Sequence, residues 1–310
     1  MLFRSFYDEV YPDWGTAQIT LRDGQIAVDG AVSVGDCGLD AYYYGPCGTG
    51  SLKVLDKGHL DAERVWVGSG NANIGYGGSH GSVEVERDGL ITSETVGLGF
   101  NDPDNFVKIA GENARWINEG SFFVQDGGLT VGPGGYLKTG TLTGGPIRLH
   151  GGEIRAGELS SEGLDFKSGR INIAGGYLYL GDSDFVIPNG AEVRFQDGGY
   201  QNLVTQGNDL TVGDRKSGLP AVLELSTGGR VWSSDAKVNT NAQVSVRDSH
   251  SFWSAKDLVV SGELALARIE DRATGHADSL LVADGGQFQL DGNGTLWNAG
   301  TVTIRGSRSA

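Results

Sequence analysis

Two cysteines, Cys37 and Cys47, are the only cysteines of the chain, and nine residues separate them. In an oxidising surface environment a disulfide could close this short loop and stabilise the protein by about 2–3 kcal/mol in the chain-entropy model. The alternative is two unpaired thiols. Because two cysteines without a partnering histidine are a poor metal site, we expect neither a metal nor a cofactor here.

Three consecutive tyrosines, Tyr42, Tyr43 and Tyr44, lie between these cysteines. Tyrosine is rigid and amphipathic, so an exposed run of it could bind a sugar or a protein. The alternative is that the three rings fold back and cover the apolar edge of the domain. The segment is therefore a candidate binding loop.

One short motif matches a catalytic signature literally. Gly77–Gly81 has the G-x-S-x-G pattern of a nucleophile elbow, with Ser79 as the nucleophile. That elbow requires a strand before it and a helix after it, whereas Ser82–Val85 alternates like a strand. In a chain so rich in glycine and serine the match is expected by chance.

Carboxylate pairs of the kind that glycosidases use are the other catalytic possibility. Aspartate is common, but it mostly precedes glycine, as in Asp23-Gly24 and Asp88-Gly89, and turn chemistry explains that pattern. His276 and Asp278 come nearest to a catalytic pair. We therefore expect no enzyme.

Two polar loops offer the oxygen ligands that calcium prefers. They are Asn101–Asn105 and Asp291–Thr295, and neither matches an EF-hand or a calcium-binding nonapeptide. Ordinary polar turns explain both loops, so no metal site is predicted.

The elements that would position these residues show an internal repeat. Glycine accounts for 52 of the 310 residues, and each glycine inside a helix costs about 1 kcal/mol, so long helices are excluded. The repeated unit is apolar-x-apolar, a glycine turn, one apolar residue, then apolar-x-apolar-Gly. One copy consists of Leu52, Val54, Gly58, Leu60, Val65, Val67 and Gly68, and every one of these positions keeps its class 31 residues later. Looser copies begin at Ile19 and Leu223.

A second repeated element contains tryptophan. An apolar residue precedes Trp116, Trp253 and Trp297 by seven positions, and an apolar pair follows each of them. The first copy has one extra residue before its apolar pair. We expect the three rings to occupy one equivalent position, stacked in the core or at a corner.

Short alternating segments predict half-buried strands, and we expect glycine, aspartate and asparagine to supply the positive φ of the corners. Near-identical units favour an all-β solenoid over a sandwich, because a sandwich strand has no reason to repeat. We expect a parallel β-helix of about a dozen coils with ~20–30 residues each, ~50–65 Å long. Residues 19–310 would form it, with an insertion loop at about 36–51. Residues 1–18 would be an edge with a truncated or artefactual start.

At this point the residues show a family resemblance. ARWINEGSFFVQDGGLTVGPGG (Ala114–Gly135), GTLWNAGTVTIRG (Gly294–Gly306) and GHADSLLVADGGQFQLDGNG (Gly275–Gly294) resemble repeats of bacterial autotransporter passenger domains. They are equally similar to repeats of surface proteins with PEP-CTERM sorting signals. The resemblance covers nearly all of Ile19–Gly306. It implies a right-handed parallel β-helix, export to the cell surface, the outer membrane or the medium, and an adhesive or structural role. Both families carry an export signal and a C-terminal barrel or sorting tail, so we expect the chain to be a fragment.

Charge limits the partners. Lys plus Arg is 24 and Asp plus Glu is 39, which gives a net charge of −15. So acidic a surface repels nucleic acid and anionic membranes, and no segment approaches the ~20 apolar residues of a membrane span. A host or cell-surface protein or a polysaccharide is the expected partner. The rival interpretation is a carbohydrate-active β-helix, either a polysaccharide lyase or a tailspike-like depolymerase.

Overall fold

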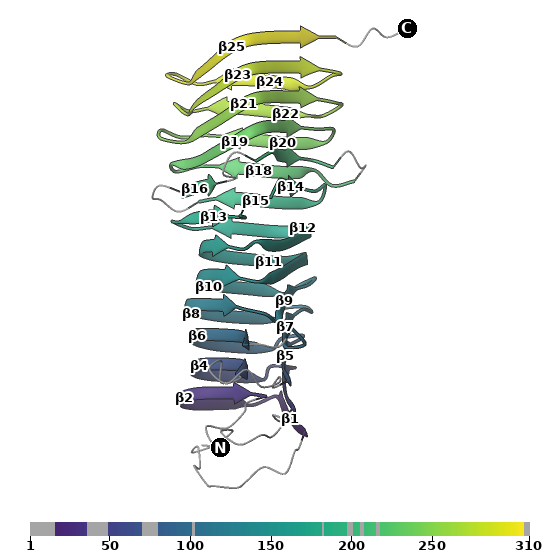
Figure 1. Cartoon of the computed structure of the whole chain (residues 1–310), viewed down its shortest axis with the longest axis vertical. Coiled ribbons are helices and arrows are strands. Elements are labelled where there is room, and N and C mark those ends of the chain that lie inside the picture. Colours follow the sequence, from purple (N-terminus) through teal and green to yellow (C-terminus); the bar gives the residue numbers. More distant parts are fainter. Residues whose placement is uncertain are drawn as a thin grey trace. The chain divides into compact units, whose positions relative to one another are not determined.

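The computed structural model describes residues 16–35, 49–69, 80–100, 103–181, 183–196, 201–204, 208–214 and 218–306. These residues form only strands and turns, so the all-β prediction is confirmed (Figure 1). The strands pair in parallel, which is consistent with a parallel β-helix. Within the described ranges, no helix is long and apolar enough to cross a membrane.

The chain divides into two compact units. Unit 1 comprises residues 1–155 and 163–165, and unit 2 comprises residues 156–162 and 166–310. Strands of unit 1 are β1 (Thr16–Arg22), β2 (Gln25–Val34), β3 (Thr49–Leu55), β4 (His59–Ser69), β5 (His80–Val85), β6 (Leu90–Phe100), β7 (Phe106–Ile109), β8 (Arg115–Val124), β9 (Gly128–Val131) and β10 (Tyr136–Gly144). Residues of β11 (Pro146–Ser160) and β12 (Gly163–Ile173) belong partly to each unit.

Strands of unit 2 are β13 (Tyr177–Tyr179), β14 (Phe185–Ile187), β15 (Ala191–Phe195), β16 (Gln201–Val204), β17 (Leu210–Val212), β18 (Ala221–Leu225), β19 (Gly229–Val238), β20 (Ala242–Val246), β21 (Phe252–Ser261), β22 (Leu266–Glu270), β23 (Thr274–Ala283), β24 (Gln287–Asp291) and β25 (Leu296–Arg305).

Two parallel ladders run through unit 1. The first joins β1, β3, β5, β7, β9 and the start of β11, and the second joins β2, β4, β6, β8 and β10. In Figure 1 the strands of the second ladder lie one above the next within this unit. Each strand thus pairs with the strand two places along the chain, so the strands form successive layers.

The repeat offset determines the register. Leu52 pairs with Val83 and Leu60 with Ile91, as the 31-residue offset predicts. The tryptophan element around Trp116 has one extra residue before its apolar pair. In the structure this extra residue forms a β-bulge in β8, at the point where the register between β8 and β6 shifts.

Unit 2 repeats this scheme with its own two ladders. One joins β12, β15, β18, β20, β22 and β24, and the other leads through β19 to β21, β23 and β25. The long strand β19 pairs with two short strands, β16 and β17. The pairing offsets in these ladders of unit 2 run from 21 residues, between Arg268 and Gln289, to 30 residues, between Glu192 and Val222.

Alternate residues of each strand are buried, because successive side chains point to opposite faces. In β5 and β18 the alternation is unbroken, and the inward side chains are Val83, Val85, Leu223 and Leu225. Columns of like apolar residues from successive strands therefore form the core of each unit.

Aspartate and glycine supply positive φ at the corners, as predicted: Asp23 has a φ of 47°, Asp88 of 57° and Gly68 of 67°. The repeated glycines Gly24, Gly58 and Gly89 do not have positive φ. At Gly89 a Cβ would lie 2.3 Å from the carbonyl oxygen of Val54 on the preceding strand layer. Glycine is required there because another backbone approaches closely.

Candidate functional site

Trp116 lies fully buried in unit 1. Its Nε1 donates a hydrogen bond to Ser93 Oγ at 2.9 Å, and its ring meets Phe122 edge-on with centroids 5.3 Å apart. Ser93 in turn donates to Asn118 Oδ1 at 3.0 Å, and Asn118 Nδ2 donates to Thr139 Oγ1 at 3.0 Å. This chain of polar groups is buried and internally satisfied, so it serves the core.

Trp253 is equally buried in unit 2, and its ring lies 6.0 Å from that of Trp297 in a T-shaped contact. Gly275 stands between them in the register, and the Trp297 ring occupies the space that a Cβ of Gly275 would need. Among the described residues, Trp253 Nε1 has no hydrogen-bond partner, and neither has Ser233 Oγ. Ser233 lies two residues after Val231, which pairs with Trp253. Ser93 likewise lies two residues after Ile91, which pairs with Trp116.

Several predicted residues lie outside the described part of the chain. They are Cys37, Tyr42, Tyr43, Tyr44, Cys47 and Ser79. The described chain resumes at β3 with Thr49, so Thr49–Ser51, which the sequence assigned to the insertion loop, belong to a strand. After Ser79, strand β5 begins at His80.

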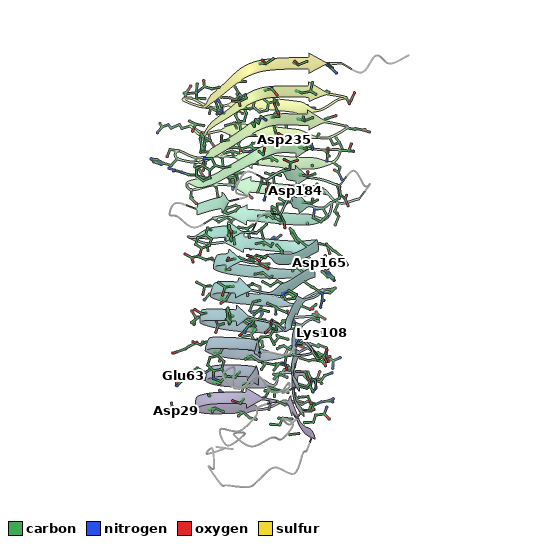
Figure 2. The ribbon with its side chains drawn as sticks, in the orientation of Figure 1. Asp29, Glu63, Lys108, Asp165, Asp184 and Asp235 are labelled. Carbon is green, nitrogen blue, oxygen red and sulfur yellow. The ribbon has the colours of Figure 1, made fainter. Side chains whose placement is uncertain are left out.

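The predicted His276–Asp278 pair lies on β23, with Nε2 and Oδ1 3.8 Å apart and both side chains exposed. A second pair that the sequence did not indicate is His150–Asp165, with Nε2 and Oδ2 2.9 Å apart. Figure 2 labels Asp165.

The two polar loops behave as turns. Asn105 is fully buried, and its Oδ1 accepts a hydrogen bond from the backbone N–H of Gly81. Asp291 closes its own loop, since its Oδ1 accepts the N–H of Gly292 at 2.8 Å. Asn101 and Asp102 lie outside the described residues. Within the described ranges, no group of three or more histidine, cysteine, aspartate or glutamate residues could hold a metal ion.

Unit 1 carries a column of exposed carboxylates. The column contains one acidic residue from each of β2, β4, β6 and β8, which are Asp29, Glu63, Glu94 and Glu119. On each strand this residue lies between two runs of residues that pair with the neighbouring strand. Figure 2 shows Asp29 and Glu63 at one edge of this unit. Adjacent strands lie ~4.8 Å apart, so the column presents about one carboxylate per layer. Two of them have a cationic neighbour, since Glu63 Oε1 lies 3.4 Å from Arg64 Nη2 and Glu119 Oε1 lies 3.1 Å from Lys138 Nζ.

Unit 2 carries a second carboxylate column. It consists of Asp184, Asp209, Asp235 and Asp257, of which Figure 2 labels the first and the third. The N–H of Asp209 donates to Asp184 Oδ1, and that of Asp235 to Asp209 Oδ1, each at 3.2 Å. These carboxylates therefore brace successive layers as well as presenting oxygens to solvent.

Aromatic rings accompany the column of unit 2. Trp232 on β19 is 39 % exposed, and its ring centroid lies 6.0 Å from that of Phe252 on β21. Trp232 shares β19 with Asp235, and the half-buried Phe252 shares β21 with Asp257, so these two strands combine an aromatic platform with hydrogen-bond acceptors. This combination is the strongest candidate for a binding surface in unit 2.

The outer face of β3 and β5 is braced by ion pairs. Lys53 Nζ lies 2.8 Å from Glu86 Oε1 and 3.8 Å from Glu84 Oε2. The hydrogen bond from Lys53 lowers the pKa of Glu86, and the same bond raises the pKa of Lys53. Both groups are therefore held in their charged forms.

Sequence reasoning missed the carboxylate columns, although signals existed. Glu63 and Glu94 are separated by the same 31 residues as the apolar repeat. In unit 2 each aspartate of the column immediately precedes a buried residue, which is Phe185, Leu210, Ala236 or Leu258. Aspartates before glycine drew attention to turns instead.

Comparison with known proteins adds no family: no protein-family model matches the chain, and neither the curated proteins nor the solved structures include a match.

Proposed function

We propose that this chain is part of an exported bacterial surface protein resembling an autotransporter passenger domain, with coils of a right-handed parallel β-helix in each unit. One observation carries the proposal. Apolar residues one repeat apart pair in register, as between Leu52 and Val83, so the repetition of the sequence is the repetition of stacked layers. Layered backbone pairing gives a stiff scaffold.

The proposed role is adhesion or surface display, without catalysis. Carboxylate columns and the Trp232–Phe252 pair lie on outward faces, where they could contact a host or cell-surface protein or a polysaccharide. A net charge of −15 opposes binding to nucleic acid. Such a protein would act at the cell surface, at the outer membrane or after secretion.

Binding to intact surfaces tests this role. The full chain, fluorescently labelled, would be titrated onto bacterial cells, animal cells and polysaccharide-coated beads. We expect saturable, reversible retention that Asp235→Asn with Asp257→Asn weakens and that Leu219→Lys, at an exposed residue outside the column, leaves unchanged. Retention no better than that of the heat-unfolded chain would contradict adhesion.

A carbohydrate-active enzyme is the second candidate, and one observation favours it. Asp184, Asp209, Asp235 and Asp257 are aligned on successive layers, and the strands that carry Asp235 and Asp257 also carry the aromatic pair Trp232–Phe252. Carboxylates in pairs are what a polysaccharide-cleaving surface requires. Incubation with acidic and neutral polysaccharides, followed by size-exclusion chromatography, separates the two functions. Shortened polymer that Asp235→Asn protects would establish the enzyme, whereas retention of full-length polymer supports the adhesin.

A further inference from the structure

Aromatic side chains line up in two neighbouring outward columns of unit 2. In one column the register leads from Tyr177 on β13, through β16 and β19, to Phe252 on β21. In the other it leads from Tyr179 on β13, through β16, to Trp232 on β19 and on to His276 on β23. Figure 1 shows β13, β19, β21 and β23 in this order along the unit. We call these five side chains the aromatic strip.

The strip is open to solvent. Trp232 and Tyr177 are each 39 % exposed, and among the described Phe, Tyr and Trp side chains of unit 2 no other is exposed to the same extent. The His276 side chain is 47 % exposed, and the ring centroids of Trp232 and Phe252 lie 6.0 Å apart on adjacent layers. Because exposed aromatic rings in one file contribute little to a core, they mark a contact surface.

The spacing of the strip is that of the strand layers. Trp232, Ser254 and His276 follow one another in one column on β19, β21 and β23. Adjacent strands lie ~4.8 Å apart, so the backbones that carry Trp232 and His276 are roughly 9.6 Å apart, with only the short serine side chain between them in the column. Consecutive sugar rings of an extended polysaccharide follow one another at a similar interval, so a polymer lying along the column meets one layer per sugar.

The side chains of the two columns match both parts of a sugar ring. The C–H groups on the face of a pyranose carry a small positive charge and stack on the negative face of an aromatic ring. The hydroxyl groups around its edge need donors and acceptors, which Ser254, Thr274 and Arg230 supply next to the rings in the same columns. A wholly apolar partner would desolvate these polar groups without pairing them, at a cost in free energy.

Charge selects among polysaccharides. Asp235 lies three residues after Trp232, and Asp257 lies three residues after Ser254, so two carboxylates of the column in unit 2 border the strip. The whole chain carries a net charge of −15. A field of this sign repels polymers rich in uronate, sulfate or phosphate. The strip therefore favours a neutral polysaccharide.

We propose that the aromatic strip binds a neutral polysaccharide, which lies along the stacking direction of the layers of unit 2 with sugar rings on Trp232 and Phe252. Tyr177 and His276 extend the contact on either side of these two rings. The inference rests on the proposed adhesive role and names the class of ligand that this surface takes.

Calorimetric titration of the full chain tests the class of ligand. The probes are cellohexaose, chitohexaose and maltohexaose as neutral oligomers and hexagalacturonate as the anionic one. We expect at least one neutral hexamer to bind and its dimer to bind about tenfold more weakly, because the dimer spans fewer layers. Hexagalacturonate should not bind. Binding of the anionic oligomer alone, or of none of the oligomers, overturns the proposal.

Variants of the strip test the stacking. Trp232→Phe keeps an aromatic face and should retain most of the affinity, whereas Trp232→Leu keeps apolar area without a ring and should weaken binding about tenfold or more. Phe252→Ala should weaken binding as well. Phe106→Ala, at a phenylalanine of unit 1 that is also 39 % exposed, is the matched control and should leave the affinity unchanged. Circular dichroism establishes that each variant is folded, and equal affinities for Trp232→Leu and the wild type overturn the stacking.

Retention on cells separates this inference from the proposed function. If wild type and Trp232→Leu are retained on cells equally and bind no oligosaccharide, the inference fails and adhesion stands. If Trp232→Leu loses retention while no oligosaccharide binds the wild type, the strip contacts a protein instead, which also overturns the inference. If a neutral hexamer binds the wild type and not Trp232→Leu, but no cell retains the chain, the inference stands and adhesion is contradicted.

Discussion

At the scale of single residues, the interior of unit 1 depends on a hydrogen bond to a tryptophan. Ser93→Ala removes the acceptor of Trp116 Nε1 and leaves that N–H buried without a partner. Because an unsatisfied buried donor retains its desolvation cost, we expect a loss of about 1–3 kcal/mol in the free energy of unfolding. Urea denaturation followed by tryptophan fluorescence measures it.

A matched control separates this hydrogen bond from the loss of any hydroxyl group. Ser121 lies on β8, and its Oγ accepts a solvent-exposed hydrogen bond from Thr141 Oγ1. Ser121→Ala should change stability by no more than about 0.5 kcal/mol. Equal losses for the two variants would contradict the special role of Ser93.

Acid should weaken the Lys53–Glu86 pair. The pKa of Glu86 is lowered in the folded state, so its contribution is present above the unfolded-state pKa and is lost as pH falls through the folded-state value. The raised pKa of Lys53 makes its own contribution disappear only at alkaline pH, as pH rises through that value. Because both side chains are about one third exposed, the pair contributes at most ~1 kcal/mol.

Comparison with Lys53→Met measures this contribution. The stability difference between wild type and variant should be largest near neutral pH and shrink as pH falls from about 5 to about 3. A difference independent of pH would show that Lys53 acts through its aliphatic stem.

At the scale of elements, the sequence predicted the strand register, because like residues stack on like residues and the 31-residue offset repeats that stacking. It could not predict which turn residue takes positive φ, since Asp23, Gly24, Asp88 and Gly89 are all compatible with a tight corner. It also missed the carboxylate columns, because a solvent-facing position follows no apolar pattern and is recognised only once the register is known.

Corner glycines provide the element-scale prediction. Gly89→Ala places a Cβ 2.3 Å from the Val54 carbonyl oxygen, so backbone must move and stability should fall by more than ~2 kcal/mol. Gly24 has the same position in the first described layer, where the nearest atom of the described residues would lie 3.5 Å from its Cβ. Gly24→Ala should therefore change stability by no more than about 1 kcal/mol. Thermal unfolding measures both changes in stability. Similar losses of stability at the two sites would show that the cost comes from the backbone conformation of glycine and not from the space available for a Cβ.

At the scale of the whole molecule, a net charge of −15 works against compaction, because the folded chain brings carboxylates together. The effect is concentrated where acids of successive layers share one position, as Glu63 and Glu94 do on β4 and β6. Added salt should therefore raise the melting temperature, since the Debye length falls from about 10 Å at 0.1 M to about 3 Å at 1 M.

The double variant Glu63→Gln/Glu94→Gln tests this repulsion. Removal of two like charges on adjacent strands should stabilise the fold by about 0.2–1 kcal/mol in low salt, reduced by the loss of the exposed ion pair between Glu63 Oε1 and Arg64 Nη2, which lie 3.4 Å apart, and the gain should disappear in about 1 M salt. Asp56→Asn is the opposite control, because Asp56 Oδ2 lies 3.8 Å from Arg22 Nη1 and its Oδ1 is paired with Arg87. Neutralising a paired carboxylate should lower the melting temperature in low salt. A gain from the double variant that persists in high salt would place its cause in side-chain packing instead of charge.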